Sequence, residues 1–579
     1  FGDGGGGVNR DMSENRRRID KIPGLPNLKI STAGEYFRKL KETVKNTDQY
    51  IHTWDGELYL EYHRGTYTSQ SHNKRMNRKM ELLYRRAEWL TAMEAMQQSG
   101  IEGARQEELT KGWKHILTDQ FHDIIPGSSI HEVYEDSRKD YVYIENIAQD
   151  VINGCYHNIL EEKQNTYTVI NASGWESDQV VAFPGNAEGI YRDSEGNELV
   201  SQTGNGITYV EVKNVPSMGT KTIFYEKTGN DAAKTAFTIN GKEIDSPFYH
   251  MTLNQYGQIT RLYDKTYKRD VLPNGERANV LQAFEDKPLD NDAWDIDIFY
   301  QQKMREVTDL KVFEITEMGA LRMCVHMEWK YMNSEISQDM ILYSKSRRID
   351  FKTHVDYHEQ HQLLKAAFPV DVRSTYGTYD VQYGNVRRPN HWNTSWDQAR
   401  FETVAHRWAD LSERNYGVSL LNDCKYGHDI KDNVMRISLL KAATHPDHLQ
   451  DQGMHTFTYA LLPHGGDFVE GHVVQEAFAL NEPMQAAAGK SKLAYESFLS
   501  FDNDQIEVDA VKQSEDGRYL VIRFHEFAGS HQNVTVTPGF AYKAWAECDL
   551  RERPIGGFTD KKMELGLHAY EIKTMLVEI

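Results

Sequence analysis

A histidine and an aspartate stand side by side just before a helix-breaking turn: His122 and Asp123 precede Pro126 and Gly127. An imidazole nitrogen is a good zinc ligand, and a neighbouring carboxylate can orient that ligand or bind a hydroxyl group. Because Pro126 stops a helix, the pair would lie in a last helical turn and could project past the helix end. The pair is therefore a candidate for binding a metal ion and a hydroxylated substrate.

The spacing leaves two other interpretations of His122 open. A histidine near a helix C-terminus can simply stabilise the negative end of the helix dipole, and spacing alone favours this role. His115, Asp119 and His122 also fall at i, i+4 and i+7, so they would share one helix face and could bind a metal by themselves. Such spacing is more often a solvated polar stripe.

Three helical segments must position this corner. From about Asn73 the apolar residues recur every three or four positions, which predicts a helix, and a second helix is expected from Ala104 to Phe121. A third should follow the turn, with an apolar stripe from Val133 to Ile159, and Ser129 with Glu132 predicts a capping box at its start. The apolar face of the first helix contains Met76, Met80, Leu83, Ala87, Leu90 and Met93. Three long helices with short links predict an antiparallel bundle.

The segments on either side of the bundle have a different pattern of residue types. After Asn165, short β-branched and aromatic runs alternate with Gly, Asn or Asp up to Ile579, which predicts two or three β-sandwiches. Before the bundle, the sequence predicts a basic helix within residues 9–21, a short strand at 27–31 and a helix at 33–45. A lone strand and helix cannot bury both faces, so this segment is expected to be the end of a larger domain.

Two stretches of the β region could also take part in chemistry. The run Asp292–Asp297 (DAWDID) places three carboxylates around Trp294, as in a clamp for sugar hydroxyls with a stacking ring, although an ordinary acidic loop is the commoner use. Residues 383–402 have few strand signals and many polar and aromatic groups, which predicts a long functional loop.

The composition excludes several classes of partner. The 579 residues contain 66 basic and 86 acidic side chains, a net charge of −20, which argues against nucleic acid and anionic membranes as partners. No apolar run reaches the roughly 18–20 residues that a membrane-spanning helix needs. The four cysteines are far apart without a CxxC pair, which argues against a thiolate zinc site or a disulfide framework and makes a cytoplasmic location the default. They are Cys155, Cys324, Cys424 and Cys548.

Four longer stretches resemble the α-mannosidases of glycoside hydrolase family 38, most of all the bacterial and cytosolic branch. They read GELYLEYHRGTYTSQSHNKRMNRKMELLYRRAEWL, FHDIIPGSSIHEVYEDS, DAWDID and YGNVRRPNHWNTSWDQARFE, in this order. The resemblance extends from Phe1 to the C-terminus and implies a multidomain α+β fold: the end of an α/β barrel, a three-helix bundle, and several β-sandwich domains that include a large supersandwich. The expected domains are a barrel remnant at 1–55, the bundle at 56–163, a small β-sandwich at 164–235, the supersandwich at 236–470 and a C-terminal β-sandwich at 471–579.

The resemblance also implies a chemistry. Family members are retaining, exo-acting hydrolases of terminal α-linked mannose that use one divalent ion, usually Zn²⁺, with Co²⁺ and Ca²⁺ as alternatives. His122 matches a metal ligand of the family and Asp123 matches a residue that contacts substrate hydroxyls, so the resemblance favours ligation over helix capping at His122. The Gly-rich start resembles a closing loop of the active site and makes Asp3 a substrate-binding candidate. Trp294 and Asp295 are expected to reach the same cleft.

Part of the family pattern has no match in this chain. The early His-x-Asp motif, the nucleophile and the general acid are expected upstream of Phe1, so the chain should lack most of the catalytic barrel and be inactive in isolation. The expected partner is an α-mannoside oligosaccharide, and a homo-oligomer is compatible with the sequence. Two alternatives stay open: a non-catalytic carbohydrate-binding or scaffolding module, and an α-linked substrate other than mannose.

Overall fold

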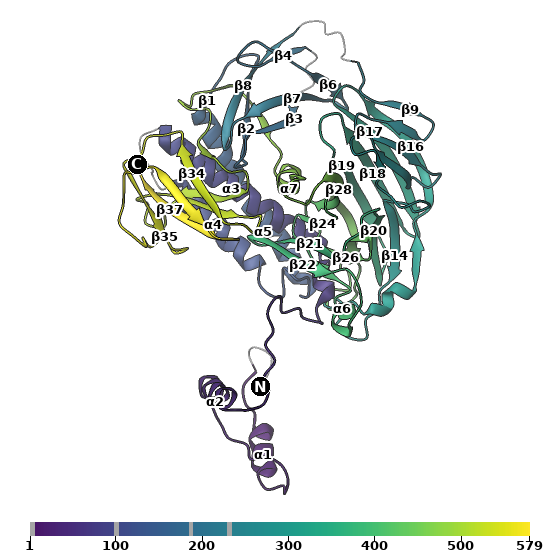
Figure 1. The fold of residues 1–579 in the computed structure, drawn as a ribbon, viewed down its shortest axis with the longest axis vertical. Coiled ribbons are helices and arrows are strands. Elements are labelled where there is room, and N and C mark those ends of the chain that lie inside the picture. The colour runs from purple at the N-terminus through teal and green to yellow at the C-terminus, as the bar shows by residue number, and fades with distance from the viewer. Residues whose placement is uncertain (1–5, 98–103, 185–188, 228–233) are drawn as a thin grey trace. The chain divides into compact units, whose positions relative to one another are not determined.

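The computed structural model describes residues 6–97, 104–184, 189–227 and 234–579, and its fold is drawn in Figure 1. The chain divides into two compact units, Phe1–Tyr59 and Leu60–Ile579. Each unit is described by itself.

The first unit contains two helices, α1 (Arg10–Ile19) and α2 (Ala33–Lys45), as the sequence predicted. Side chains cap both starts: Asn9 accepts a hydrogen bond from the backbone N–H of Met12, and Thr32 accepts one from that of Glu35. The strand expected at residues 27–31 is not formed; that prediction was wrong, because the described part of this unit offers no second strand to pair with it. Neither helix buries a side chain within the unit.

The second unit begins with the predicted three-helix bundle. A 3₁₀ turn, η1 (Arg64–Tyr67), leads into α3 (Ser71–Gln97), α4 (Ala104–Asp119) and α5 (His131–Ile159), and the three helices pack against one another. The predicted apolar faces form the core between them. Its buried members include Met80, Ala87, Leu90, Met93, Tyr141, Ile144, Ala148 and Cys155.

The ends of two of these helices differ from the prediction. Helix α4 stops at Asp119, two residues before Phe121. Helix α5 starts at His131 and its N-cap residue, Ile130, makes no side-chain cap, so the capping box of Ser129 and Glu132 is not formed. The reason is local: Ser129 lies outside the helix start, and its backbone N–H donates to the Tyr134 hydroxyl at 2.8 Å.

A small pair of antiparallel sheets follows the bundle. Val169, Val181, Tyr191, Val210 and Ile223 form its core. The first sheet has the order β29 (Gln485–Ala488), β2 (Thr166–Asn171), β8 (Gly219–Glu226), β4 (Ile190–Arg192) and β5 (Glu198–Leu199). The second has the order β3 (Ser177–Phe183), β7 (Ile207–Val215) and β6 (Ser201–Gly204).

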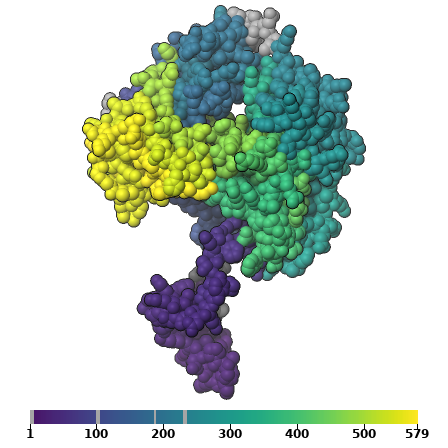
Figure 2. Space-filling view, in the orientation of Figure 1, coloured from purple at the N-terminus to yellow at the C-terminus, as the bar shows by residue number. Residues whose placement is uncertain are grey.

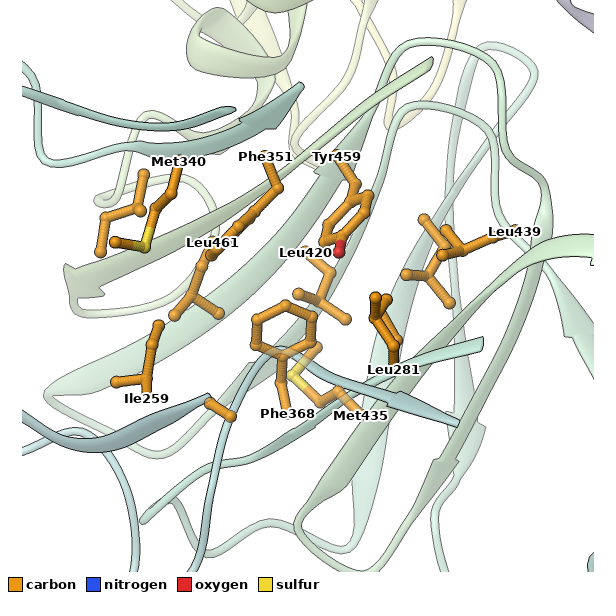
Figure 3. Packing of buried hydrophobic residues seen from close by; sticks show 14 of the residues in the cluster. Ile259, Leu281, Met340, Phe351, Phe368, Leu420, Met435, Leu439, Tyr459 and Leu461 are labelled. Carbon is orange, nitrogen blue, oxygen red and sulfur yellow. The ribbon is translucent and has the colours of Figure 1, made fainter. Parts of the chain in front are cut away.

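Three larger sheets surround one extensive apolar core. Figure 3 shows part of this core, where Phe351, Phe368 and Tyr459 lie among aliphatic side chains. The nine-stranded sheet has the order β16 (Asp309–Met318), β17 (Arg322–Tyr331), β18 (Ser334–Tyr343), β19 (Ile349–Tyr357), β28 (Gly453–Gly465), β25 (Tyr416–Asn422), β24 (Trp408–Ser412), β21 (Tyr376–Val381) and β22 (Gly384–Pro389). The six-stranded sheet has the order β15 (Met304–Glu306), β14 (Val280–Glu285), β20 (Gln362–Pro369), β27 (Val434–Lys441), β26 (Gly427–Lys431) and β23 (Thr403–Val404). The five-stranded sheet has the order β13 (Arg269–Asp270), β12 (Ile259–Asp264), β11 (Tyr249–Leu253), β10 (Glu243–Asp245) and β9 (Thr238–Asn240).

The C-terminal sheets share their core with the helix bundle. Phe498, Ile522 and Phe524 belong to the same buried cluster as Met80 and Ile144, and the C-terminal strands, yellow in Figure 1, lie beside the bundle helices. The two sheets have the orders β31 (Leu499–Phe501), β34 (Gln532–Pro538), β36 (Met563–Leu567) and β32 (Ile506–Gln513), β33 (Leu520–Glu526), β37 (Ile572–Glu578), β35 (Ala544–Cys548). A two-stranded ladder of β1 (Leu160–Glu161) and β30 (Lys490–Ser491) follows α5. Figure 2 shows the C-terminal residues as a surface continuous with the green segment before them.

The mixed α+β class with a helix bundle and β-sandwich sheets is thus confirmed. Short helices complete it: η2 (Ile298–Gln302), α6 (Ser395–Ala399) and α7 (Val473–Asn481). All four cysteines are buried and free. Among the described residues, none of the helices combines the length and the apolar character that a bilayer crossing requires.

Candidate functional site

The corner between α4 and α5 holds Asp123 in place. Residues 121–127 form successive turns. The Ser128 hydroxyl donates to Oδ1 of Asp123 at 3.0 Å, and the Tyr134 hydroxyl donates to the Asp123 carbonyl at 3.2 Å. From α3, the Lys74 ammonium donates to the carbonyl of Ile125 at 2.8 Å. The corner is therefore fixed by side chains from α3 and α5.

His122 remains accessible on this corner. Its side chain is 75% exposed, its Nε2 lies 3.2 Å from Oδ2 of Asp123, and its ring centroid lies 4.3 Å from that of Phe121. The imidazole is thus next to a carboxylate without being enclosed by the bundle. His122 and Asp123 are brought together as a pair of metal-competent donors.

The proposed triad of His115, Asp119 and His122 is not assembled. Because α4 ends at Asp119, His122 lies in the turn beyond and does not continue the helix face. Nδ1 of His115 instead lies 3.2 Å from Oδ1 of Asp140. Asp119 is buried, and burial, reinforced by the charge of Asp140, raises the pKa of its carboxyl to about 7. Within the described ranges, no three His, Cys, Asp or Glu side chains gather in a metal-binding group.

One short stretch, His63–Ser71, connects this corner to the DAWDID loop; we call it the junction segment. Gly127, with φ of +90°, packs so closely on Ser69 that a Cβ atom would lie 2.5 Å from the Ser69 carbonyl oxygen. The Ser69 hydroxyl donates to the carbonyl of Ala293 at 2.6 Å. A single residue therefore contacts both motifs, which are far apart in the sequence.

The DAWDID loop is tightly bound to the junction segment. The backbone N–H groups of Gly65 and Thr66 donate to the Trp294 carbonyl at 2.7 and 3.2 Å. Oδ1 of Asp295 accepts a hydrogen bond from the backbone N–H of His63, and Asp295 is buried. Trp294 is half-buried. The loop is thus a structural partner of the junction segment, and substrate binding by Trp294 and Asp295 stays a prediction.

The fourth sequence motif reaches the same segment. The Arg64 guanidinium lies 4.5 Å from the centroid of the Phe401 ring and donates to the Ala399 carbonyl at 2.8 Å. The expectation of a long loop at 383–402 was wrong, because residues 384–389 pair with β21 as β22 and residues 395–399 form α6. A capping box of Thr394 and Asp397 starts that short helix.

Three acidic or basic residues near the junction segment were not found from the sequence. Asp451 accepts the backbone N–H groups of Gln70 and Ser71 at 3.0 and 2.7 Å, so it caps the start of α3. Asp447 accepts from the Gln70 amide at 2.8 Å and lies 3.0 Å from Nδ1 of His131. Lys441 contacts Asp286 in the buried floor beneath Gly65. These residues are far from the junction segment in the sequence and approach it only in the folded chain. Local sequence spacing therefore could not predict them.

Asp3, the remaining candidate, lies outside the described residues.

The chain is a multidomain α+β protein with a helix bundle and β-sandwich sheets, and comparisons with known proteins identify its family. Four family models match in order: the glycosyl hydrolases family 38 N-terminal domain at residues 1–57, the alpha mannosidase middle domain at 61–159, the family 38 C-terminal domain at 244–449 and the family 38 C-terminal beta sandwich domain at 505–575. The chain belongs to glycosyl hydrolase family 38.

Individual relatives agree with this assignment. The chain is 31% identical to Alpha-mannosidase 2C1 of Homo sapiens, with 100% of this chain and 55% of the relative covered, and 32% identical to Alpha-mannosidase G of Dictyostelium discoideum, with 99% and 57% covered. It thus spans little more than half the length of these relatives. A crystal structure of an alpha-mannosidase from Enterococcus faecalis V583 has the same fold, with a TM-score of 0.79 at 15% identity over 99% of this chain and 75% of that one.

Proposed function

We propose that the protein containing this chain is an α-mannosidase that hydrolyses terminal α-linked mannose from oligosaccharides. The observation that carries the proposal is the arrangement around Ser69: the corner that displays His122 and Asp123 and the loop that contains Trp294 pack on the same junction segment. The similarity to alpha-mannosidases over the whole of this chain supports it.

The donor set of the corner suits a divalent metal ion, for which Zn²⁺ is our first choice. His122 offers an exposed imidazole nitrogen, and Asp123 offers an oxygen 3.2 Å from it. These two donors are fewer than the three or four protein ligands of a usual zinc site, so we propose that further ligands come from the N-terminal domain of the family. When bound, the ion would supply Lewis acidity toward sugar hydroxyls.

The residues of this chain would position the sugar. The Asp123 carboxylate, held by the Ser128 hydroxyl, can accept a hydrogen bond from a sugar hydroxyl through its second oxygen. We propose a retaining reaction, in which two carboxylates about 5–5.5 Å apart act as nucleophile and as acid/base. We assign both carboxylates to the part of the family's N-terminal domain that lies outside residues 1–57.

We further propose a cytoplasmic location. The four free, buried cysteines support it, because disulfides are rare in a reducing compartment.

The test is metal analysis and aryl α-mannoside hydrolysis by the full-length protein and its His122→Ala variant. We expect metal content and kcat/KM to fall together by at least about 10–100-fold, as for loss of a metal-orienting group. His115→Ala is the matched control, since that partly exposed imidazole lies beside Asp140 and Tyr143, outside the corner. Unchanged metal content and activity in His122→Ala would refute the site. Sugar binding without any hydrolysis by the full-length protein would favour a non-catalytic carbohydrate-binding module.

A further inference from the structure

We propose that the protein has a second carbohydrate site, which binds a neutral mannose oligosaccharide in a cavity between the helix bundle, the β21–β22 hairpin and the C-terminal sheets. The cavity has a volume of about 630 Å³, within the usual range of ligand sites. None of His122, Asp123, Trp294 and Asp295 lines it. Only the identity of the sugar as mannose rests on the proposed function.

The cavity has a buried floor and an open mouth. Arg78, Glu88 and Glu507 line it and are buried. Leu117 and Tyr383 also line it and are well exposed. A ligand could therefore enter from solvent and reach polar groups that are held in fixed positions.

The charges in the cavity are balanced, which argues against an ionic ligand. Five basic and six acidic side chains line it. Arg407 lies between Asp380, at 3.2 Å from its Oδ2, and Glu507, at 2.9 Å from its Oε2. His525 pairs with Asp509, Nδ1 to Oδ1, at 2.9 Å. An anion or a cation would meet charges of both signs, whereas neutral hydroxyl groups can donate to the carboxylates and accept from the guanidinium groups.

Two aromatic rings supply apolar surface beside these polar groups. The Trp113 indole N–H donates to Oε1 of Glu88 at 2.9 Å, which fixes the ring on α4. The Tyr383 ring meets the edge of His525 with centroids 5.4 Å apart. Aromatic rings that lie beside polar groups suit ligands that have both hydroxyl groups and C–H faces, as sugars do.

The position of Tyr383 is unusual for its residue type. It occupies the two-residue loop between β21 and β22, where Val381 pairs with Gly384, and its φ is +59°. Gly or Asn is favoured in this left-handed region, and bulky residues there mark functional constraint more often than chance. The hairpin is anchored, because the Asn385 amide donates to the Phe527 carbonyl at 3.1 Å. The strained loop thus presents the Tyr383 ring from a rigid support.

The test uses hydrogen–deuterium exchange of the full-length protein with mannotriose, in the His122→Ala background so that binding at the corner is weakened. We expect saturable protection of the segments around Trp113 and Tyr383 at millimolar sugar. Tyr383→Gly removes the ring while suiting the left-handed φ, so the variant should fold normally and bind mannotriose roughly fivefold more weakly. Tyr143→Ala, an exposed ring outside the cavity, should leave binding unchanged.

Lack of protection at these segments, or protection that Tyr383→Gly does not weaken, would overturn the second site. Protection by inorganic phosphate instead of mannotriose would overturn the neutral ligand, and protection by maltotriose alone would overturn mannose. Hydrolysis of an aryl α-mannoside by the wild-type protein is measured separately. Protection without hydrolysis would contradict the proposed function and support the second site. Hydrolysis without protection would support the proposed function and contradict the second site.

Discussion

The Ser69 hydroxyl donates a hydrogen bond to the Ala293 carbonyl at 2.6 Å, and the Ser69 carbonyl lies directly against Gly127. Ser69 thereby joins the two segments that hold the candidate site residues. The stability and the geometry of the site should both depend on close backbone approach at this junction segment.

Gly65→Ala should destabilise the junction segment. A Cβ atom there would lie 2.9 Å from the Trp294 carbonyl oxygen and 3.0 Å from that of Ala293, both in backbone. We expect a loss of about 1–3 kcal/mol in the free energy of unfolding, measured by denaturant titration. Gly556→Ala is the control, because no atom of the described ranges lies within 4 Å of its added Cβ. Equal stabilities of the two variants would contradict the packing described here.

Ser128→Ala should affect substrate use more than metal binding. The hydroxyl orients Oδ1 of Asp123 at 3.0 Å, whereas His122 approaches the other oxygen, Oδ2. In the full-length protein we expect KM for an aryl α-mannoside to rise, with metal content maintained and kcat less affected. Ser128→Thr keeps the hydroxyl and should restore KM. Loss of metal in Ser128→Ala would show that the hydroxyl acts on the whole corner.

Asp119→Asn should change how stability depends on pH. Burial raises the pKa of Asp119 from 3.8 to about 7, and none of the described residues hydrogen-bonds its buried Oδ2. An acid with a raised pKa in the folded state binds more protons when folded, so its contribution to stability is present below pH 4 and is lost as pH rises to 7. The stability of the variant relative to wild type should therefore increase between pH 4 and pH 7, as measured by urea midpoints. A constant difference over this window would contradict the prediction.

Lys365→Met should be strongly destabilising. The Lys365 ammonium is buried against Glu402, Asp429 and the Tyr300 hydroxyl, the last at 3.1 Å. Its removal takes a charge partner from each of two buried carboxylates, of which Asp429 keeps Arg436 at 2.8 Å, and we expect a cost of about 3–5 kcal/mol. The measurement is guanidinium unfolding. Lys330→Met, in a surface pair with Glu335, should change stability by less than about 1 kcal/mol. A similar small effect at Lys365 would mean that the network relaxes easily.

Sequence reasoning succeeded where a local period carried the information. The helices with stripes such as Met80 and Leu90 were predicted because one face must be buried every three to four residues. The contact of Ser69 with Ala293 was not predicted, since 224 positions separate the two and neither residue type signals a partner. The pairing of residues 384–389 was missed for a similar reason: its short hairpin loop has Tyr383 where turn residues usually reveal a strand pair.

The apolar interior common to α3, α5 and the C-terminal strands has a consequence for how the molecule can be divided. Phe498, Ile522 and Met575 belong to the same buried cluster as Tyr84 and Ile144. Truncation near residue 495 would expose the apolar side chains by which the helices pack on these strands. A shortened polypeptide should therefore aggregate or be degraded. The C-terminal strands are therefore needed to complete the core of this helix bundle, although the contacts that fix the corner around His122 come from α3 and α5.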